Sequence, residues 1–353
     1  MRPRAMPMPT HQPAVDRLLR LRARDRAGSL PFVSIVVPAY NEQDTVVPLC
    51  RRLEAVLDGE GLRREIVFVN DGSADATLDR LLDLAEEDGR RRVVNLSRNF
   101  GKEAAISAGI DHARGDVLVI IDADLQHPPE VIPAFLERWR AGYDVVYGAR
   151  TSRESETLAK RFSADWFYRI FNWFSRVRLP ENAGDFRLID RRVAEVLRGL
   201  PEKNRFMKGL FAWAGFPTVG VPYRQQERTS ARSAFTFWKL WNFALDGLFA
   251  FSTVPLRVWS YVGGLLALVA LIYMVQIVLQ VLLVGKDTPG YASLLTVVLF
   301  LGGIQLLTLG ILGEYVGRLF IEVKNRPIYV VEAEHSRDAS ATRPAPQDGP
   351  RHG

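Results

Sequence analysis

The sequence predicts a doubly wound α/β sheet followed by a helical membrane hairpin. Short β-branched runs alternate with longer helical stretches between residues 32 and about 150, and this alternation is typical of a sheet with parallel strands. Further along, residues 258–284 contain no charged side chain, and residues 291–315 contain one acid near their end. Each run exceeds the roughly 20 residues that a helix needs to span a hydrocarbon core.

The composition fits a folded chain with phosphate-bearing or lipid ligands. The 353 residues are enough for one or two domains with their own hydrophobic core. The formal net charge of +6 suits phosphate groups and anionic lipid. The single cysteine, Cys50, excludes an intramolecular disulfide. Its position in an expected helix favours a buried apolar role over a nucleophile or metal ligand.

The first half of the chain contains four expected strands and three expected helices. The strands are expected at residues 32–37, 65–69, 92–96 and 117–121, and the helices at residues 45–57, 76–87 and 103–113. Pro38 is expected to end the first strand. The fourth strand is apolar without interruption, as expected at the centre of a parallel sheet. Ligands of such sheets bind beyond the carboxyl ends of the strands, so we expect the site there.

Polar turns follow three of these strands. They are Pro-Ala-Tyr-Asn-Glu at 38–42, Asn-Asp-Gly-Ser at 70–73 and Asp-Ala-Asp-Leu-Gln at 122–126. One such turn alone is ordinary turn chemistry, but three at one edge of a sheet indicate a site.

Asp122 and Asp124 carry the strongest chemical signal. In an extended segment side chains i and i+2 point the same way, so both carboxylates would face one site. With Gln126 they offer the hard oxygen donors that suit Mg²⁺ or Mn²⁺, which would neutralise a departing diphosphate. The alternative is a solvated acidic turn.

The two apolar runs are joined only by residues 285–290, which predicts a membrane hairpin rather than two buried helices. Arg257 precedes the first run, and Arg318, Lys324 and Arg326 follow or end the second, so both ends of the hairpin are expected in the cytoplasm. Before the hairpin, residues 235–251 place their polar side chains on one narrow helical stripe. This pattern predicts a helix in the headgroup plane, with a core helix of the soluble domain as the alternative.

Both ends of the chain are polar. Residues 1–30 mix arginine and proline without the apolar segment of a secretory signal, and a disordered tail is favoured over an arginine run that contacts lipid headgroups. The expected organisation is therefore a disordered tail at 1–30, a catalytic domain at 31–232, interfacial helices at 233–256, a two-helix transmembrane hairpin at 257–318, a cytoplasmic extension at 319–333 and a disordered tail at 334–353.

The three turns, in this order, resemble those of the family 2 inverting glycosyltransferases, which have the GT-A (Rossmann-like) nucleotide-sugar-binding fold. The similarity extends from about residue 33 to residue 329 and is sharpest at residues 182–188, 204–209 and 238–247. With two carboxy-terminal spans, these stretches are most similar to the polyprenyl-phosphate glycosyltransferases. That group includes dolichyl-phosphate mannose synthase and, with a closer resemblance, the bacterial bactoprenol glucosyltransferases.

The resemblance implies a role for each matched position. The donor would be bound by Pro38, Tyr40, Glu42, Asp71, Lys102, Asp122, Ala123 and Arg150, with Asp71 on the base. The metal ligands would be Asp124, Gln126 and Asp122. The catalytic residues would be Asp185, Asp124 and Arg187, with Asp185 orienting the acceptor or acting as a base. An acid paired with Arg187 or another cation is the structural alternative for Asp185.

The acceptor phosphate would be bound by Arg228, Arg232 and Ser233. Family members usually carry Arg-x-x-Gly-x-Ser-Lys here, whereas residues 228–234 read Arg-Thr-Ser-Ala-Arg-Ser-Ala. The glycine and the lysine are absent, and Arg232 supplies a cation at a different position.

The activity implied is transfer of a hexose, first of all glucose from UDP-glucose, to polyprenyl (undecaprenyl) phosphate on the cytoplasmic leaflet, with Mg²⁺ or Mn²⁺. The acceptor phosphate oxygen would attack the anomeric carbon in line, with inversion. Other UDP- or GDP-sugars, such as GDP-mannose, stay open, as does a non-catalytic membrane scaffold. Further expected partners are a second copy of the chain, in tetramers, and a flippase for the lipid-linked sugar, but no nucleic acid.

Two other enzyme classes fit less well. Processive polysaccharide synthases share the three turns but carry a Gln-x-x-Arg-Trp motif and more spans. A nucleotidyltransferase would need a glycine-rich, basic first loop where this chain has residues 38–42.

Overall fold

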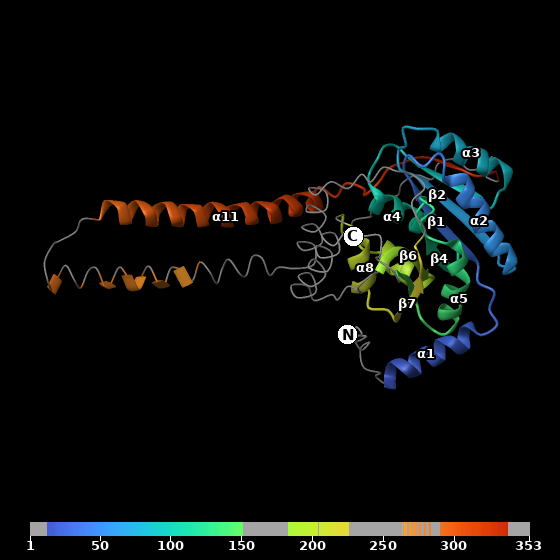
Figure 1. The fold of residues 1–353 in the computed structure, drawn as a ribbon, viewed down its shortest axis with the longest axis horizontal. Coiled ribbons are helices and arrows are strands. Elements are labelled where there is room, and N and C mark those ends of the chain that lie inside the picture. The colour runs from blue at the N-terminus through green and yellow to red at the C-terminus, as the bar shows by residue number, and fades with distance from the viewer. Residues whose placement is uncertain are drawn as a thin grey trace, which may run out of the picture. The chain divides into compact units, whose positions relative to one another are not determined.

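The computed structural model describes residues 13–150, 183–203, 205–225 and 290–337, with scattered positions between 263 and 283. The described residues up to 225 and from 327 onward belong to one compact unit, and those from 263 to 326 belong to another. The first unit is an α/β domain (Figure 1). The second contains helix α11, Tyr291–Val323.

The α/β unit is built on one mixed sheet with the strand order β7-β5-β6-β4-β1-β2-β3-β8. The strands are β1 Val33–Ala39, β2 Arg64–Asn70, β3 Arg91–Leu96, β4 Val117–Ile120, β5 Val145–Arg150, β6 Ala183–Asp190, β7 Thr218–Tyr223 and β8 Val331–His335. The four strands that the sequence predicts, β1 to β4, are mutually parallel. The predicted doubly wound core is therefore confirmed.

The expected all-parallel surroundings of β4 are wrong. β4 lies between β1, which is parallel to it, and β6, which is antiparallel. β6 also pairs antiparallel with β5, and β5 pairs parallel with β7. An apolar run shows that a strand is buried on both faces, but it carries no information about the direction of its neighbours.

Helices cover both faces of this sheet. They are α1 Pro13–Arg26, α2 Val46–Gly59, α3 Thr77–Glu87, α4 Lys102–His112, α5 Ile132–Arg140, α7 Arg191–Arg198 and α8 Met207–Trp213, with a 3₁₀ turn η1 at Pro129–Val131. Alternate strand residues pack on opposite faces: Ile35 and Ile66 lie with α2, α3 and α5, and Val67 and Val69 lie with α4. Because side chains along a strand alternate with a period of two residues, each strand turns one face to each helical layer.

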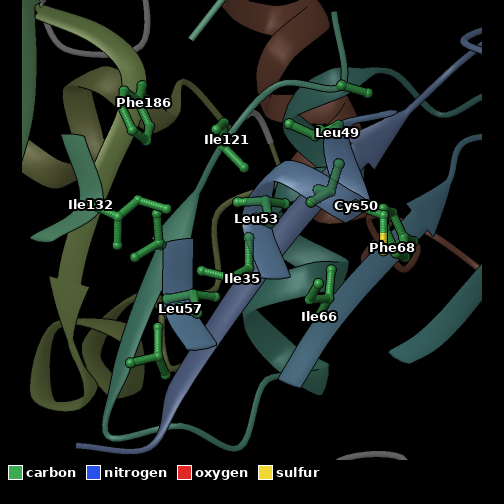
Figure 2. Packing of buried hydrophobic residues seen from close by; sticks show 14 of the residues in the cluster. Ile35, Leu49, Cys50, Leu53, Leu57, Ile66, Phe68, Ile121, Ile132 and Phe186 are labelled. Atoms are coloured by element: carbon green, nitrogen blue, oxygen red, sulfur yellow. The ribbon is translucent and has the colours of Figure 1, made fainter. Parts of the chain in front are cut away.

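Helix α2 forms because its apolar residues recur on one face. Leu49, Cys50, Leu53 and Leu57 are buried and pack on the strands (Figure 2). Burial raises the pKa of the Cys50 thiol to about 12, so the thiolate does not form near neutral pH. The predicted apolar role of Cys50 is therefore confirmed.

Strand β1 continues through Pro38, which was expected to end it, as far as Ala39. The Val36 carbonyl accepts from the Ile121 N–H, so the polar groups of Val36, and by alternation those of Pro38, face the β4 side. β4 ends at Ile120, opposite Val36. No strand lies beside Pro38 on that side, so a backbone N–H at this position would have no ladder partner. A proline, which lacks the N–H, is therefore tolerated there.

The expected disorder of residues 1–30 is wrong for helix α1. Arg26 is only 7% exposed, and its guanidinium donates to the carboxylates of Asp144 and Asp190, each over 2.6 Å. It also lies 4.7 Å from the centre of the Trp139 ring, and Arg22 pairs with Asp144. These acids lie 118 and 164 residues from Arg26 in the sequence. The composition of residues 1–30 alone therefore could not show that Arg26 is buried and paired.

Strand β8 corrects the expected extension at 319–333 and the start of the disordered tail at 334. It pairs antiparallel with β3 and covers that edge of the sheet. Glu334 pairs with Arg92 and lies 3.2 Å from Nδ1 of His112. The Tyr329 hydroxyl donates to Asp111 over 2.6 Å. Residues 338–353 lie outside the described part of the chain.

Among the described residues, one helical stretch, Phe300–Val323, is long and apolar enough to cross a membrane. It belongs to α11, and α11 as a whole contains the second predicted span, residues 291–315. The described positions between 263 and 283 are helical, but they are too interrupted to test the first span. The predicted interfacial helix lies outside the described residues.

We expect Arg26→Met to lower the free energy of unfolding by about 3 kcal/mol, because it leaves the buried Asp190 carboxylate, and part of Asp144, without its cation. Denaturant unfolding of the purified protein would measure this. The control is Arg24→Met, which removes an exposed arginine from the same helix. Equal unfolding midpoints for the two variants would show that these ion pairs do not hold α1 on the domain.

Candidate active site

Four charged side chains meet at the edge of the sheet where the parallel strands β1 to β4 end. Lys102 is the first residue of α4, Asp122 follows β4, and Asp185 lies in β6 beside it. Lys102 Nζ lies 2.7 Å from Asp122 Oδ1 and 2.6 Å from Asp185 Oδ2. Lys208, in α8, places its Nζ 3.6 Å from Asp185 Oδ1. The predicted edge of the sheet thus holds two carboxylates and two ammonium groups.

The charges in this cluster stabilise one another. Burial alone would lower the pKa of Lys102, but the carboxylates of Asp122 and Asp185 hold it above its ordinary value. Burial would raise the pKa of Asp185, but Lys208 and Lys102 hold it well below its ordinary value. The Lys102 side chain is still 44% exposed, so the cluster faces a site that solvent reaches. Asp185 therefore pairs with a cation, and Lys102 is its nearest partner among the described residues.

The acidic turn after β4 brings Asp122, Asp124 and His127 together. One possible ligand atom from each lies within 4.8 Å of the others. The chain turns at Ala123 and Asp124, and Leu125 adopts a φ of 60°. The two carboxylates therefore meet as predicted, but through a turn and not through an extended segment.

The donor set of this turn fits a divalent cation. Two carboxylates are hard oxygen ligands of the kind that Mg²⁺ and Mn²⁺ prefer, and an imidazole nitrogen is compatible with Mn²⁺. Gln126, the third predicted ligand, accepts through its amide oxygen from the Gln225 side chain. The Gln126 N–H donates to Asp124 Oδ1 over 3.1 Å.

His127 and Tyr223 are site residues that sequence reasoning missed. His127 Nε2 lies 3.4 Å from Asp122 Oδ2, and its Nδ1 lies 2.8 Å from the Tyr223 hydroxyl. The imidazole stacks on Phe186 with 5.3 Å between ring centres. The position of His127 directly after the acidic turn was a usable signal. Nothing local in the sequence marks Tyr223, which reaches the site from β7.

Asp71 and Gly72 fix the loop that leads to Lys102. The Asp71 carboxylate accepts from the N–H groups of Phe100 and Gly101, over 2.7 and 3.0 Å. Gly72 has a φ of +64°, and a Cβ there would lie 2.4 Å from the Arg98 carbonyl carbon. The tight approach of these two loops therefore requires a glycine. The predicted contact of Asp71 with a base stays a prediction.

The turn after β1 lies against the turn after β2. The Asn41 N–H donates to Ser73 Oγ over 3.0 Å, and Asn41 Oδ1 accepts from the Ala74 N–H. Glu42 accepts from the Thr45 hydroxyl over 2.8 Å. Of the predicted donor residues here, Tyr40 is exposed and Pro38 is buried in β1. Two of the three predicted polar turns are thus joined directly.

The predicted arginines have different surroundings. Arg150 ends β5 and forms a hydrogen bond with the Tyr223 hydroxyl. Arg187 is buried, lies 4.0 Å above the Phe211 ring and donates to the Gly184 carbonyl over 2.7 Å. The predicted acceptor residues Arg228, Arg232 and Ser233 lie outside the described residues.

Comparison with known proteins identifies relatives over most of the chain. Residues 34–198 match the family "Glycosyl transferase family 2", and residues 254–319 match the family "GtrB C-terminal hairpin". An uncharacterised glycosyltransferase of Synechocystis sp. is 49% identical over 299 residues, which is 85% of this chain and 94% of that protein. The SfII prophage-derived bactoprenol glucosyl transferase of Shigella flexneri is 45% identical over 303 residues, 86% of this chain and 98% of its own length. The prophage bactoprenol glucosyl transferase homolog of Escherichia coli K12 is 45% identical over 300 residues, 85% and 98% of the two chains.

We expect Glu103 to make the stability of the domain depend on pH. Burial, and next the charge of Asp185, raise the pKa of its carboxyl from 4.5 to about 7. A carboxyl that binds its proton more tightly when folded contributes stability that is complete below pH 4.5 and is lost as the pH rises through about 7. We expect Glu103→Gln to remove this loss.

Denaturant unfolding at several values between about pH 5 and about pH 8 would measure the effect, since this interval spans most of the titration. The control is Glu137→Gln, which replaces an exposed acid in α5. A Glu103→Gln variant with the same pH dependence as the wild type would contradict the assignment.

Proposed function

The chain belongs to glycosyl transferase family 2, and we propose that it transfers a hexose from a nucleoside diphosphate sugar to a polyprenyl phosphate. The observation that carries this proposal is the charge cluster of Lys102, Asp122 and Asp185 beside the acidic turn at 122–127. A nucleoside diphosphate brings negative charge to this edge of the sheet. Lys102 offers a positively charged group there, and the acidic turn offers the donor set for a divalent cation.

The acidic turn would hold Mg²⁺ or Mn²⁺ through Asp122 and Asp124, with Gln126 as a further oxygen donor. When bound there, the cation would neutralise the charge that develops on the departing diphosphate. The ammonium group of Lys102 lies beside the same carboxylate and would contact a phosphate oxygen of the donor. Pro38, Tyr40, Glu42, Asp71 and Ala123 would line the nucleotide pocket.

In the reaction, an oxygen of the acceptor phosphate forms a bond to the anomeric carbon as the bond from that carbon to the diphosphate breaks on the opposite side. A phosphate monoester is already ionised near neutral pH, with a second pKa of about 6, so a strong base is not required. Rate acceleration then comes from orientation and from charge neutralisation.

Asp185 would orient the acceptor side of the site. An ionised carboxylate alone would repel a phosphate, but Asp185 holds the ammonium groups of Lys102 and Lys208. These two cations, with Arg228, Arg232 and Ser233 from the acceptor segment, would receive the phosphate. Arg187 would support the site from beneath through its contacts with Phe211 and Gly184.

Glucose is the favoured sugar, and UDP-glucose the favoured donor, because several relatives at 43–45% identity are bactoprenol glucosyl transferases. The GtrB C-terminal hairpin match at 254–319 covers both predicted spans, and α11 contains one apolar stretch of sufficient length. We therefore propose a protein of the cytoplasmic membrane with two spans, and with its catalytic domain and both termini in the cytoplasm. A homo-oligomer and a flippase partner stay predictions.

The function is tested by transfer of radiolabelled sugar from a panel of UDP- and GDP-sugars to undecaprenyl phosphate, with Mg²⁺ or Mn²⁺ or with EDTA. We expect lipid-soluble product from one donor, none with EDTA, and a loss of at least about 100-fold in Asp124→Asn, because the charge-neutralising cation loses a carboxylate ligand. The control, Asp79→Asn, replaces an exposed acid of α3. Product that forms equally with EDTA would contradict the cation site, and no product from any donor would favour the scaffold.

A further inference from the structure

A row of hydrogen-bonded side chains runs from the end of β5 to the acidic turn. Arg150, the last residue of β5, bonds to the hydroxyl of Tyr223, the last residue of β7. That hydroxyl lies 2.8 Å from His127 Nδ1, and His127 Nε2 lies 3.4 Å from Asp122 Oδ2. Tyr223 and His127 are 4% and 2% exposed, so water cannot readily replace either partner.

The chemistry at both ends fixes the direction of these bonds. A guanidinium group has no acceptor, so Arg150 donates to the Tyr223 oxygen. At the other end, Asp122 pairs with the Lys102 ammonium group and is therefore a carboxylate, which can only accept. The proton of a neutral imidazole must then lie on Nε2, facing Asp122. His127 Nδ1 is left as an acceptor, and the Tyr223 hydroxyl donates to it.

The surroundings restrict the imidazole to this orientation. His127 stacks on Phe186, and Phe186 packs against Phe135 with 4.7 Å between ring centres. Tyr223 meets Phe186 edge-on at 5.8 Å. A ring confined by aromatic packing and bonded through both nitrogens has little freedom to rotate, and such restriction is what holds a functional group in a productive geometry.

We propose that Arg150, Tyr223 and His127 form a donor chain that positions Asp122, so that His127 orients a cation ligand and does not itself coordinate the cation. The inference rests on the proposed function, because it assigns Asp122 to the donor and cation side of the site. It also gives Arg150 a role apart from direct phosphate binding. His127 and Tyr223 are positioning residues of the transfer reaction.

The end of β7 and the residue Gln225 that follows it shortly are tied to the acidic turn by two contacts. Tyr223 and Gln225 both bond to the acidic turn, through His127 and Gln126 respectively. They precede the predicted acceptor segment, which begins at Arg228, by a few residues. The contacts that hold the acidic turn therefore also hold the end of β7 and Gln225, which lead into that segment in the sequence.

The competing arrangement has a distinct signature. If His127 bound the cation, its Nε2 would present a lone pair, and the proton on Nδ1 would be donated to Tyr223. Electron paramagnetic resonance of bound Mn²⁺ detects a directly coordinated nitrogen through its spin-echo modulation. We expect the modulation of a coordinated imidazole to be absent from wild-type protein with Mn²⁺ alone.

Three substitutions test the donor chain in the full-length protein. Tyr223→Phe keeps the ring and removes only the hydroxyl, and we expect the Kd for Mn²⁺ to rise about tenfold, as when a group that orients a metal ligand is lost. His127→Gln keeps an N–H donor that can reach Asp122, and should stay within about threefold of the wild type, whereas His127→Leu should lose at least as much as Tyr223→Phe. The KM for the sugar donor should rise with the Kd, and kcat should change less.

The control is Tyr143→Phe, which removes a hydroxyl from a tyrosine just before β5, and it should bind Mn²⁺ as the wild type does. A coordinated nitrogen in the wild-type spectrum would overturn the proposal, and so would an unchanged Kd in Tyr223→Phe. If wild-type protein bound no Mn²⁺ at all, the cation premise of the proposed function would fail and this inference with it. If the wild type binds Mn²⁺ and the Kd of Tyr223→Phe is unchanged, this inference alone is refuted.

Discussion

The ion pairs of Lys102 with Asp122 and Asp185 are the interaction on which the rest of the site depends. β4 and β6 are antiparallel neighbours, so they bring these two carboxylates to one edge of the sheet. Two unit charges 4 Å apart interact by about 4 kcal/mol at an effective dielectric constant of 20. A cation between them turns this repulsion into attraction, and Lys102 lies within 3 Å of both carboxylates. The fold can therefore keep two ionised acids side by side, as the proposed binding of a phosphate-bearing donor and a divalent cation requires.

The loops and helices around Lys102 fix its position. Asp71 binds two backbone N–H groups just before α4, and Gly72 permits that loop to approach. A glycine at 109 lets α4 pack closely on β1, since a Cβ there would lie 2.2 Å from Val36 Cγ1. On the opposite side, the chain through Tyr223 and His127 holds Asp122. The charges are thus positioned before any substrate binds, which is the condition under which electrostatic stabilisation costs little.

The parts of this structure that could be predicted from the sequence are those with local signals. β1 to β4 and α2 to α4 follow from the alternation of short apolar runs with helical stretches, and the acidic turn follows from its position after a buried strand. The antiparallel strand β6 and the strand β8 join the sheet through long-range pairing, which periodicity does not report. Arg26 resembled a surface charge because its partners lie more than 100 residues away. His127 was recognisable from its neighbours, whereas Tyr223 reaches the site only through the packing of β7.

A double-mutant cycle on Lys102 and Asp185 tests the central claim most directly. The rates of sugar transfer by Lys102→Met, Asp185→Asn and the double variant would be compared with the wild type. If the two side chains act as one charge pair, the double variant should be about as slow as the slower single variant, with a coupling energy of about 1–3 kcal/mol. Losses that multiply would mean that Lys102 and Asp185 act independently, and would contradict the account of the site as a single electrostatic unit.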